Sequence, residues 1–234
     1  MAPGRCWGVV PAAGSGTRMA ADLPKQYIRI AGATLLEYSL GALLRSDQIA
    51  GVVVALHPAD ELAVGLPVFA DPRVRRVAGG AQRSDSVLAA LAALLAQGEP
   101  GDWVLVHDAA RPCLQPGDLA RLIARVVASG TGGILAEAIV DTVKEATAEG
   151  LVLHTLDRSR LWRAQTPQMF RLGELHAALE SARAQGLALT DEASAMELAG
   201  HPVQLVPGSP RNLKVTLPAD LQLAAWYLDS GVSA

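Results

Sequence analysis

The segment at residues 7–19 reads WGVVPAAGSGTRM, and PKQ follows at residues 24–26. Its apolar start predicts a buried strand, and the small residues after it predict a tight loop. In an open α/β sheet, ligands bind at the carboxyl ends of the strands, where small residues let backbone N–H groups approach a phosphate chain. The segment therefore favours an α/β fold with a polyphosphate-binding loop, although a tight strand exit without a ligand has the same composition.

The spacing of this loop excludes three other ligand loops. A dinucleotide-binding loop needs glycine where Met19 stands, and a Walker loop needs Gly-Lys-Ser/Thr. A nucleophile elbow around Ser15 needs glycines at the positions of Ala13 and Thr17.

Beyond this segment, short β-branched runs alternate with longer Ala- and Leu-rich patterns of helical spacing. This alternation is typical of a mostly parallel sheet covered by helices, a Rossmann-like three-layer sandwich. We expect strands at 7–10, 51–56, 74–78, 103–107 and 133–138, and helices at 34–46, 84–97 and 116–129. Further along we expect helices at 172–185 and 190–199, strands near 203–206 and 212–215, and a closing helix after Pro218.

Length and charge limit the classes of protein to which the chain can belong. A chain of 234 residues forms one large domain, which we place at residues 1–234. The net charge of -3 and the lack of a Lys/Arg-rich block argue against nucleic-acid and membrane partners. The apolar runs are too short to span a membrane, and no secretory signal is visible. Two cysteines, Cys6 and Cys113, are too few for a disulfide scaffold, so we expect both to be buried in a reducing cytoplasm.

Residues 139–163 break the alternation of strands and helices. They carry scattered charges and short apolar pairs, and Glu149-Gly150 predicts a hairpin turn. We therefore expect an arm that leaves the domain.

Two cations and one carboxylate accompany the predicted strand ends. Arg18 and Lys25 follow the loop, where they can stabilise the negative charge that develops during attack on phosphorus, or be solvated surface charges. Asp108 ends the fourth strand, and Mg²⁺ prefers one or two carboxylates together with phosphate oxygens. We therefore take Asp108 as the metal candidate, and His107 beside it as a structural histidine.

Other polar groups are ambiguous when each is taken alone. Gly79-Gly80 is a second point at which a ligand can approach the backbone, and Ser84 is expected to cap the helix that follows. Polar clusters also stand at residues 141–142, 157–158, 165–168, 190–194 and 212–216, and each can be a turn or a helix cap.

Taken together, the segments form an ordered set: PAAGSGTRM, PKQY, GGAQRSDSV, VHDAARP, DTVK, DR, TPQMF, TDEAS and NLKVT. This set resembles the 2-C-methyl-D-erythritol 4-phosphate cytidylyltransferase family of the non-mevalonate isoprenoid pathway, over residues 7–227. The resemblance implies a nucleotide-diphospho-sugar transferase fold in a bacterial, cytoplasmic homodimer. It also implies a Mg²⁺-dependent transfer of CMP from CTP to a sugar-alcohol phosphate, with release of pyrophosphate.

The resemblance also implies roles for individual residues. The catalytic cations are Arg18, Lys25, Arg158 and Lys214. The nucleotide-binding residues are Ala12, Ala13, Gly14, Ser15, Gly16, Gly80, Ala81, Ser86 and Asp108. The residues around the sugar phosphate are Arg111, Thr142, Arg158, Thr166, Thr190 and Lys214. The arm at residues 139–163 would cross to the second subunit, so that active sites are shared. Ala81-Gln82 departs from the acidic residues usual in the family, which leaves side-chain contacts at these positions in doubt.

Two alternatives remain open on sequence. A cytidylyltransferase of the same family that acts on ribitol 5-phosphate would keep the nucleotide loop and change the acceptor pocket. A nucleotide-binding module without catalysis would have lost Arg18, Lys25 or Asp108, and all three are present.

Overall fold

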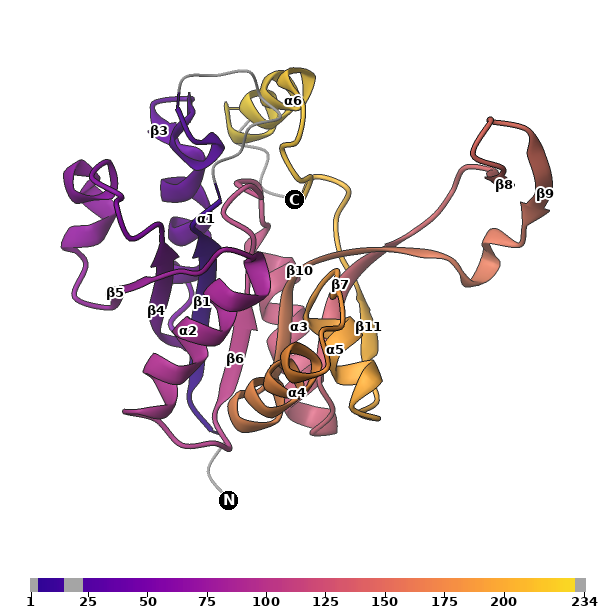
Figure 1. Ribbon diagram of the computed structural model, residues 1–234. Coiled ribbons are helices and arrows are strands. Elements are labelled where there is room, and N and C mark those ends of the chain that lie inside the picture. The colour runs from indigo at the N-terminus through magenta and orange to yellow at the C-terminus, as the bar shows by residue number, and fades with distance from the viewer. Residues whose placement is uncertain (1–3, 15–22, 230–234) are drawn as a thin grey trace.

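The computed structural model describes residues 4–14 and 23–229. Its central sheet has seven strands in the order β11-β7-β10-β6-β1-β4-β5 (Figure 1). The strands are β1 (Cys6–Ala12), β4 (Ile49–Leu56), β5 (Val74–Ala78), β6 (Trp103–Val106), β7 (Gly133–Ala138), β10 (Trp162–Arg171) and β11 (Gln204–Pro207). All neighbours pair in parallel except β10, which is antiparallel to both β6 and β7.

Helices cover both faces of this sheet. They are α1 (Leu35–Leu44), α2 (Arg83–Leu95), α3 (Pro116–Ser129), α4 (Leu172–Ala184) and α5 (Glu192–Leu198). Helix α6 (Pro218–Asp229) packs instead in a separate cluster with Leu35 at the start of α1. Two short strands, β2 (Arg29–Ile30) and β3 (Ala33–Thr34), form a separate hairpin before α1. The expectation of an α/β three-layer sandwich with a mostly parallel sheet is confirmed.

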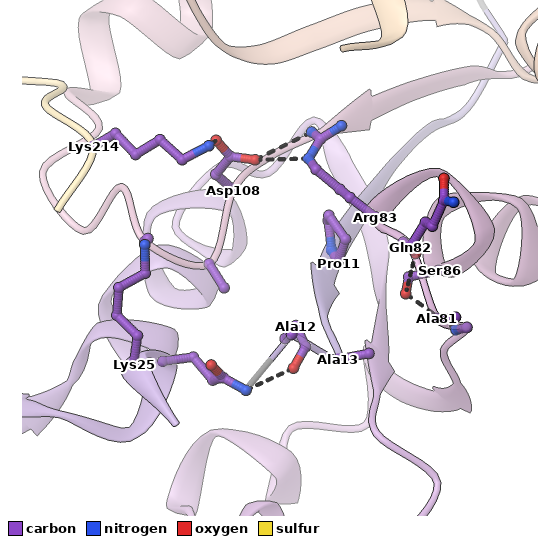
Figure 2. A pocket seen from close by; sticks show the side chains of 15 residues that line it. Pro11, Ala12, Ala13, Lys25, Ala81, Gln82, Arg83, Ser86, Asp108 and Lys214 are labelled. Atoms are coloured by element: carbon purple, nitrogen blue, oxygen red, sulfur yellow. Dashed lines mark hydrogen bonds and ion pairs between the residues drawn. The ribbon is translucent and has the colours of Figure 1, made fainter. Parts of the chain in front are cut away.

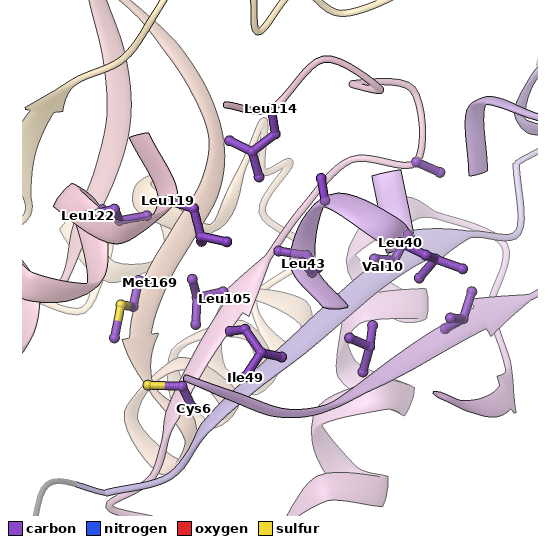
Figure 3. Close-up of a cluster of buried hydrophobic side chains, with 14 of the residues drawn as sticks. Cys6, Val10, Leu40, Leu43, Ile49, Leu105, Leu114, Leu119, Leu122 and Met169 are labelled. Carbon is purple, nitrogen blue, oxygen red and sulfur yellow. The ribbon is translucent and has the colours of Figure 1, made fainter. Parts of the chain in front are cut away.

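Successive residues of a strand point to opposite faces of the sheet, and this alternation divides the core in two. Val10 and Leu105 pack with Leu40 and Leu43 of α1 and Leu122 of α3 (Figure 3). On the other face, the neighbouring strand residues pack against α2, α4 and α5: Val9, Val53, Val104, Val106 and Phe170. The central strands β4 and β6 are apolar on both sides because both faces of the sheet are covered there, as expected for parallel sheets.

The boundaries of several elements follow from local chemistry. The Thr34 hydroxyl accepts from the backbone N–H of Glu37 at 3.1 Å, and the Glu37 carboxylate accepts from the N–H of Thr34 at 2.8 Å, so α1 begins with a capping box. Gly130, at a φ of 69°, ends α3 in the left-handed conformation that glycine adopts without strain. Cys6 and Cys113 are buried as expected, and burial raises the pKa of Cys113 to about 12.

One strand was missed, and one expected strand does not form. The sequence pattern did not predict β10, which contains Arg163, Gln165 and Gln168 and is interrupted by Pro167. The strand expected near residues 212–215 does not form. Leu213 and Val215 instead pack with Leu35 and with α6 in a third apolar cluster, and the N–H of Val215 donates to the carbonyl of Ala110 at 2.8 Å.

Between β7 and β10, a hairpin of β8 (Val143–Ala146) and β9 (Val152–Leu156) extends away from the body of the molecule (Figure 1). Its turn is closed by a hydrogen bond of 2.9 Å from the N–H of Thr147 to the carbonyl of Leu151, and Gly150 has a φ of 84°. Several apolar side chains of this segment are exposed: Val140, Leu151, Val152 and Leu153. Among the described residues, no helix has the length and apolar character needed to cross a bilayer.

Candidate functional site

A cavity of about 260 Å³ opens at the carboxyl ends of β1, β5 and β6 (Figure 2). Its lining residues come from the loop after β1, the turn at Lys25, the start of α2, the loop after β6 and the segment before α6. They are Pro11, Ala12, Ala13, Gly14, Lys25, Gln26, Gly80, Ala81, Gln82, Arg83, Ser86, Asp108, Ala109, Ala110 and Lys214. The predicted nucleotide residues Ala12, Ala13, Gly14, Gly80, Ala81, Ser86 and Asp108 thus share one cavity.

The loops after β1 and β5 touch, and Gly79 allows this contact. A Cβ on Gly79 would lie 2.6 Å from the Cβ of Ala13 and 2.8 Å from Oγ of Ser86, so any larger residue would push the loops apart. The hydroxyl of Ser86 accepts from the N–H of Gly80 at 3.2 Å and donates to the carbonyl of Gln82 at 3.2 Å. Ser86 is buried and shapes the turn that lines the cavity.

The expectation that Ser84 caps the following helix was wrong. Helix α2 begins one residue earlier, at Arg83, with Gln82 as its N-cap. The carboxylate of Asp85 accepts from the N–H of Gln82 at 3.0 Å and so satisfies a backbone donor at the helix start.

Lys25 reaches the cavity from a 3-10 turn at Lys25–Tyr27. The next residue anchors this turn, because the side chain of Gln26 is buried and donates to the carbonyl of Ala12 at 2.8 Å. Nζ of Lys25 donates to the carbonyl of Val215 at 2.8 Å. The ammonium group is therefore held between the loop after β1 and the segment before α6. Ser15, Gly16 and Arg18 lie outside the described residues, so their assigned roles stay predictions.

Asp108 is the electrostatic centre of the site. Its Oδ1 accepts from Nε of Arg83 at 3.1 Å, and its Oδ2 lies 2.9 Å from Nζ of Lys214 and 3.6 Å from Nε of Arg111. Lys214 and Arg83 approach the carboxylate from opposite sides (Figure 2). Burial alone would raise the pKa of Asp108, but the charges of Arg83, Lys214 and Arg111 hold that pKa well below its usual range. The carboxylate is therefore ionised.

The sequence prediction missed a second buried acid, Glu192 at the start of α5. The guanidinium of Arg83 donates to it twice, from Nη1 at 2.6 Å and from Nη2 at 3.0 Å. Burial opposes the charge on Arg83, yet Glu192 and Asp108 raise its pKa above the usual value. The sequence at residues 190–194, TDEAS, could have indicated this acid. Glu192 lies in the first turn of a helix that is mostly buried, and a buried carboxylate needs a cationic partner.

A second cavity, of about 240 Å³, lies beside the first. Its lining residues are Arg83, Asp108, Arg111, Ala164, Gln165, Thr166, Gln168, Thr190, Asp191 and Lys214. The two cavities share Arg83, Asp108 and Lys214. The structure thus brings the predicted acceptor residues Arg111, Thr166, Thr190 and Lys214 together, on the far side of Asp108 from the nucleotide residues.

Thr166 and His107 hold the backbone on which Asp108 stands. The hydroxyl of Thr166 accepts from the N–H of Asp108 at 3.0 Å and lies 3.0 Å from Nδ1 of His107, and Nε2 of His107 lies 3.1 Å from the carbonyl of Arg111. Since a carbonyl can only accept, Nε2 carries the proton and Nδ1 accepts from Thr166. Burial lowers the pKa of His107 to about 4, so the ring is neutral and structural, as predicted.

Comparison with known proteins identifies the family. The family model described as 2-C-methyl-D-erythritol 4-phosphate cytidylyltransferase matches residues 7–230. A Pseudomonas putida protein of that name is 52% identical over 217 residues, which are 92% of each chain. The chain belongs to this family. It is therefore a cytidylyltransferase, an enzyme of the nucleotidyltransferase class.

Solved structures of family members have the same fold. A crystal structure titled 4-diphosphocytidyl-2C-methyl-D-erythritol synthase has a TM-score of 0.84 and 40% identity, covering 97% of this chain and 99% of its own. The Francisella tularensis 2-C-methyl-D-erythritol 4-phosphate cytidylyltransferase has a TM-score of 0.82 and 34% identity, covering 95% and 99%.

Two of the residues that the family resemblance assigned to the acceptor do not join the others. Thr142 and Arg158 belong to the segment between β7 and β10, and neither lines the two cavities. Arg158 is exposed and donates to the carbonyl of Val140 within the same segment. In this chain the acceptor cavity is therefore assembled without them.

The described acidic side chains around the cavities are too few to bind a metal ion on their own. Among residues 4–14 and 23–229, no group of three or more His, Cys, Asp or Glu side chains could hold a metal ion. A metal at Asp108 would therefore need oxygens from a ligand, which is how Mg²⁺ is usually held in nucleotide sites. Lys214, which contacts Oδ2, is the most exposed of the three cations on Asp108. Oδ2 is therefore the oxygen that can give up its contact with Lys214 and bind a metal ion instead. The residues fit Mg²⁺ carried mainly by phosphates.

Proposed function

We propose that the chain transfers CMP from CTP to 2-C-methyl-D-erythritol 4-phosphate and so gives 4-diphosphocytidyl-2-C-methyl-D-erythritol and pyrophosphate. The observation that supports this most directly is the shared wall of the two cavities. One cavity is lined mainly by small residues with Lys25 at its edge, and the other mainly by charged and polar groups. Asp108, Arg83 and Lys214 line both. A nucleotide and an acceptor phosphate bound on either side would meet at this wall.

The chemistry is a single displacement at phosphorus. An oxygen of the acceptor phosphate attacks the α-phosphorus of CTP, the bond from the α-phosphorus to the bridging oxygen breaks, and pyrophosphate leaves with the electron pair. Positioning and charge neutralisation supply most of the acceleration in such reactions. Lys25 would balance the charge on the nucleotide side and Lys214 on the acceptor side. Arg18 is assigned to the same task from its place in the sequence.

The nucleotide would lie against the loops that meet at Gly79. Cytosine would contact the backbone of Ala12 and Ala13 and the turn at Gly80, Ala81 and Ser86. The triphosphate would lie along Gly14, Ser15 and Gly16. The loops after β1 and β5 touch at Gly79, and this contact would keep the part of the cavity that holds the base narrow. A narrow base site favours a pyrimidine over a purine.

Asp108 would hold Mg²⁺ together with the phosphates of the nucleotide. The ion, when bound, neutralises part of the triphosphate charge and polarises the phosphorus–oxygen bonds. The protein's part is to present one ionised carboxylate at the end of β6, next to cations that can also contact phosphate.

The acceptor would bind to Arg111, Thr166, Thr190 and Lys214 of one chain and to Thr142 and Arg158 of a second. Two observations support a homodimer in which the arm at residues 139–163 crosses to a neighbouring copy. Thr142 and Arg158 do not line the cavities of their own chain, and the hairpin exposes apolar side chains that a partner would cover. We place this enzyme, a single domain over residues 1–234, in the bacterial cytoplasm.

One assay tests the substrate and metal assignments. Pyrophosphate release is measured with CTP, ATP, GTP or UTP, each against 2-C-methyl-D-erythritol 4-phosphate or ribitol 5-phosphate, with and without Mg²⁺. We expect release with CTP and the erythritol substrate, and none after the metal is chelated. Faster turnover of ribitol 5-phosphate, equal rates with ATP, or full activity in excess chelator would contradict the assignment.

A further inference from the structure

The guanidinium of Arg83 joins two buried acids at the wall between the cavities. It donates one hydrogen bond to Oδ1 of Asp108 and two to the carboxylate of Glu192. The three residues come from different parts of the fold: Arg83 from the first turn of α2, Asp108 from the loop after β6 and Glu192 from the first turn of α5. Arg83 lines both cavities, whereas Glu192 is 1% exposed and lines neither.

The double hydrogen bond to Glu192 limits what Arg83 can do. Nη1 and Nη2 donate to Glu192, and the adjacent edge of the guanidinium faces Asp108, with Nε and Nη2 each 3.1 Å from Oδ1. This edge points in one fixed direction because the guanidinium is planar. The carboxylate of an aspartate rotates easily about its last torsion unless its oxygens are held. Arg83 holds Oδ1, so Oδ2 is left facing Lys214 and Arg111.

A second buried aspartate shows that a buried carboxylate does not need a cation that is anchored to another acid. Asp102, at the opposite end of β6, is also buried. It accepts from the N–H groups of Arg5 at 3.0 Å and Glu99 at 3.2 Å, and from the indole of Trp7 at 3.0 Å. Neutral donors thus satisfy Asp102, while Asp108 is held by a cation that is itself anchored to another acid.

We infer that Arg83 is a positioning residue for the reaction, anchored by Glu192, and that it sets the rotation of the Asp108 carboxylate so that Oδ2 serves the bound nucleotide and acceptor. The inference rests on the proposed function, because it concerns the ligands of the same two cavities. Glu192 acts entirely through Arg83. It thereby affects the binding of CTP although it lines neither cavity.

The test is a double-mutant cycle between Glu192 and Asp108, read out as the affinity for CTP in the presence of Mg²⁺. Binding is measured by titration calorimetry on the full chain, without acceptor. We expect Glu192→Gln to weaken CTP binding roughly tenfold in the wild-type background, and less than about twofold in the Asp108→Asn background, since coupled neighbours are not additive. Arg83→Lys keeps the charge but lacks the planar fork, so it cannot make the double hydrogen bond to Glu192 and hold Oδ1 of Asp108 in a fixed direction. It should weaken binding as much as Glu192→Gln.

Asp102→Asn is the matched control, because it also changes one buried carboxylate to an amide but lies at the other end of β6. It should lower the urea midpoint of unfolding and leave CTP affinity unchanged within about twofold. A Glu192→Gln variant that behaves like Asp102→Asn would overturn the inference. So would an equal loss of affinity in both backgrounds, or an Arg83→Lys variant that binds like wild type.

Failure of the proposed function would look different. A wild-type chain that binds CTP with the expected coupling but releases no pyrophosphate would contradict the reaction and support the positioning role.

Discussion

The two cavities at the strand ends and the arm at residues 139–163 differ in how their charged groups are held. Asp108 is nearly buried and touches three cations, each on a different part of the chain. Arg158 is exposed, and its guanidinium donates to the carbonyl of Val140, within the same arm. The strand-end region is thus assembled by contacts within one chain, while the arm offers groups whose contacts within the chain do not fix them at a site. This difference indicates which variants should act within a subunit and which should act across a dimer.

The largest effect is expected for Lys25→Ala at the strand ends. Loss of a preorganised charge that acts mainly in the transition state costs about a hundredfold or more in kcat. Steady-state kinetics with both substrates saturating give the comparison. Arg183→Ala serves as control, because Arg183 pairs with Glu180 on the exposed face of α4, and it should keep kcat within about twofold. If Lys25→Ala altered only the KM for CTP, the role in the transition state would be wrong.

A smaller effect is expected for Lys214→Ala on the acceptor side of Asp108. A charge-assisted hydrogen bond contributes about 1.5–3 kcal/mol, so the KM for the sugar phosphate should rise roughly tenfold or more. The KM for CTP should change much less, and kcat should also fall. Measuring each KM with the other substrate saturating separates the two sides. A larger rise in the KM for CTP than in that for the acceptor would place Lys214 on the nucleotide.

The third prediction tests whether the arm acts across the dimer. Inactive Lys25→Ala and inactive Arg158→Ala are mixed under conditions that exchange subunits. If the arm acts in trans, each mixed dimer has one site with both lesions and one intact site, and about half of the dimers are mixed. Roughly a quarter of wild-type activity should therefore return.

Native mass spectrometry confirms that subunits have exchanged in this experiment. No recovery after confirmed exchange would mean that the arm serves its own chain, although a dimer could still form.

The smallest effect is expected for Leu153→Ala on the hairpin. Leu153 is 57% exposed, and surface substitutions usually change the free energy of unfolding by less than about 0.5 kcal/mol. In a dimer that covers the hairpin, this small loss should grow with protein concentration, because association stabilises the folded chain. Urea unfolding at two protein concentrations provides the measurement. A wild-type midpoint that does not depend on concentration would contradict a dimer built on the hairpin.

The sequence predicted the parts of the fold in which apolar spacing reflects burial. Strands β1, β4, β5, β6, β7 and β11 and helices α1 to α6 lie within a few residues of their expected places. Most of them, such as β4 and β6, bury a continuous run or stripe of apolar side chains. Strand β10 was missed for the opposite reason. Gln165 and Gln168 are buried in it by hydrogen bonds to distant segments, so their polarity hid a central strand.

The site was predicted in part for a similar physical reason. Residue type and strand ends pointed to Asp108, Lys25 and the small loops, and the structure brings these together. The ion pair of Arg83 and Glu192 joins positions 109 residues apart. Local sequence patterns do not predict which acid a given arginine will pair with. The role proposed for Arg158 would depend on a second chain, and local spacing carries no information about a second chain.

The arm leaves and re-enters the sheet at a single point. Ala138 pairs with Trp162, and the N–H of Ile139 donates to the carbonyl of Leu161 at 3.0 Å. In polymer terms the intervening segment is a closed loop, whose entropic cost grows with the logarithm of its length, by only about 0.6 kcal/mol for each doubling. The arm can therefore vary in length and sequence independently of the sheet, because such changes do not shift the register of β7 against β10. The residues of the arm can therefore diverge while the carboxyl ends of the central strands stay unchanged.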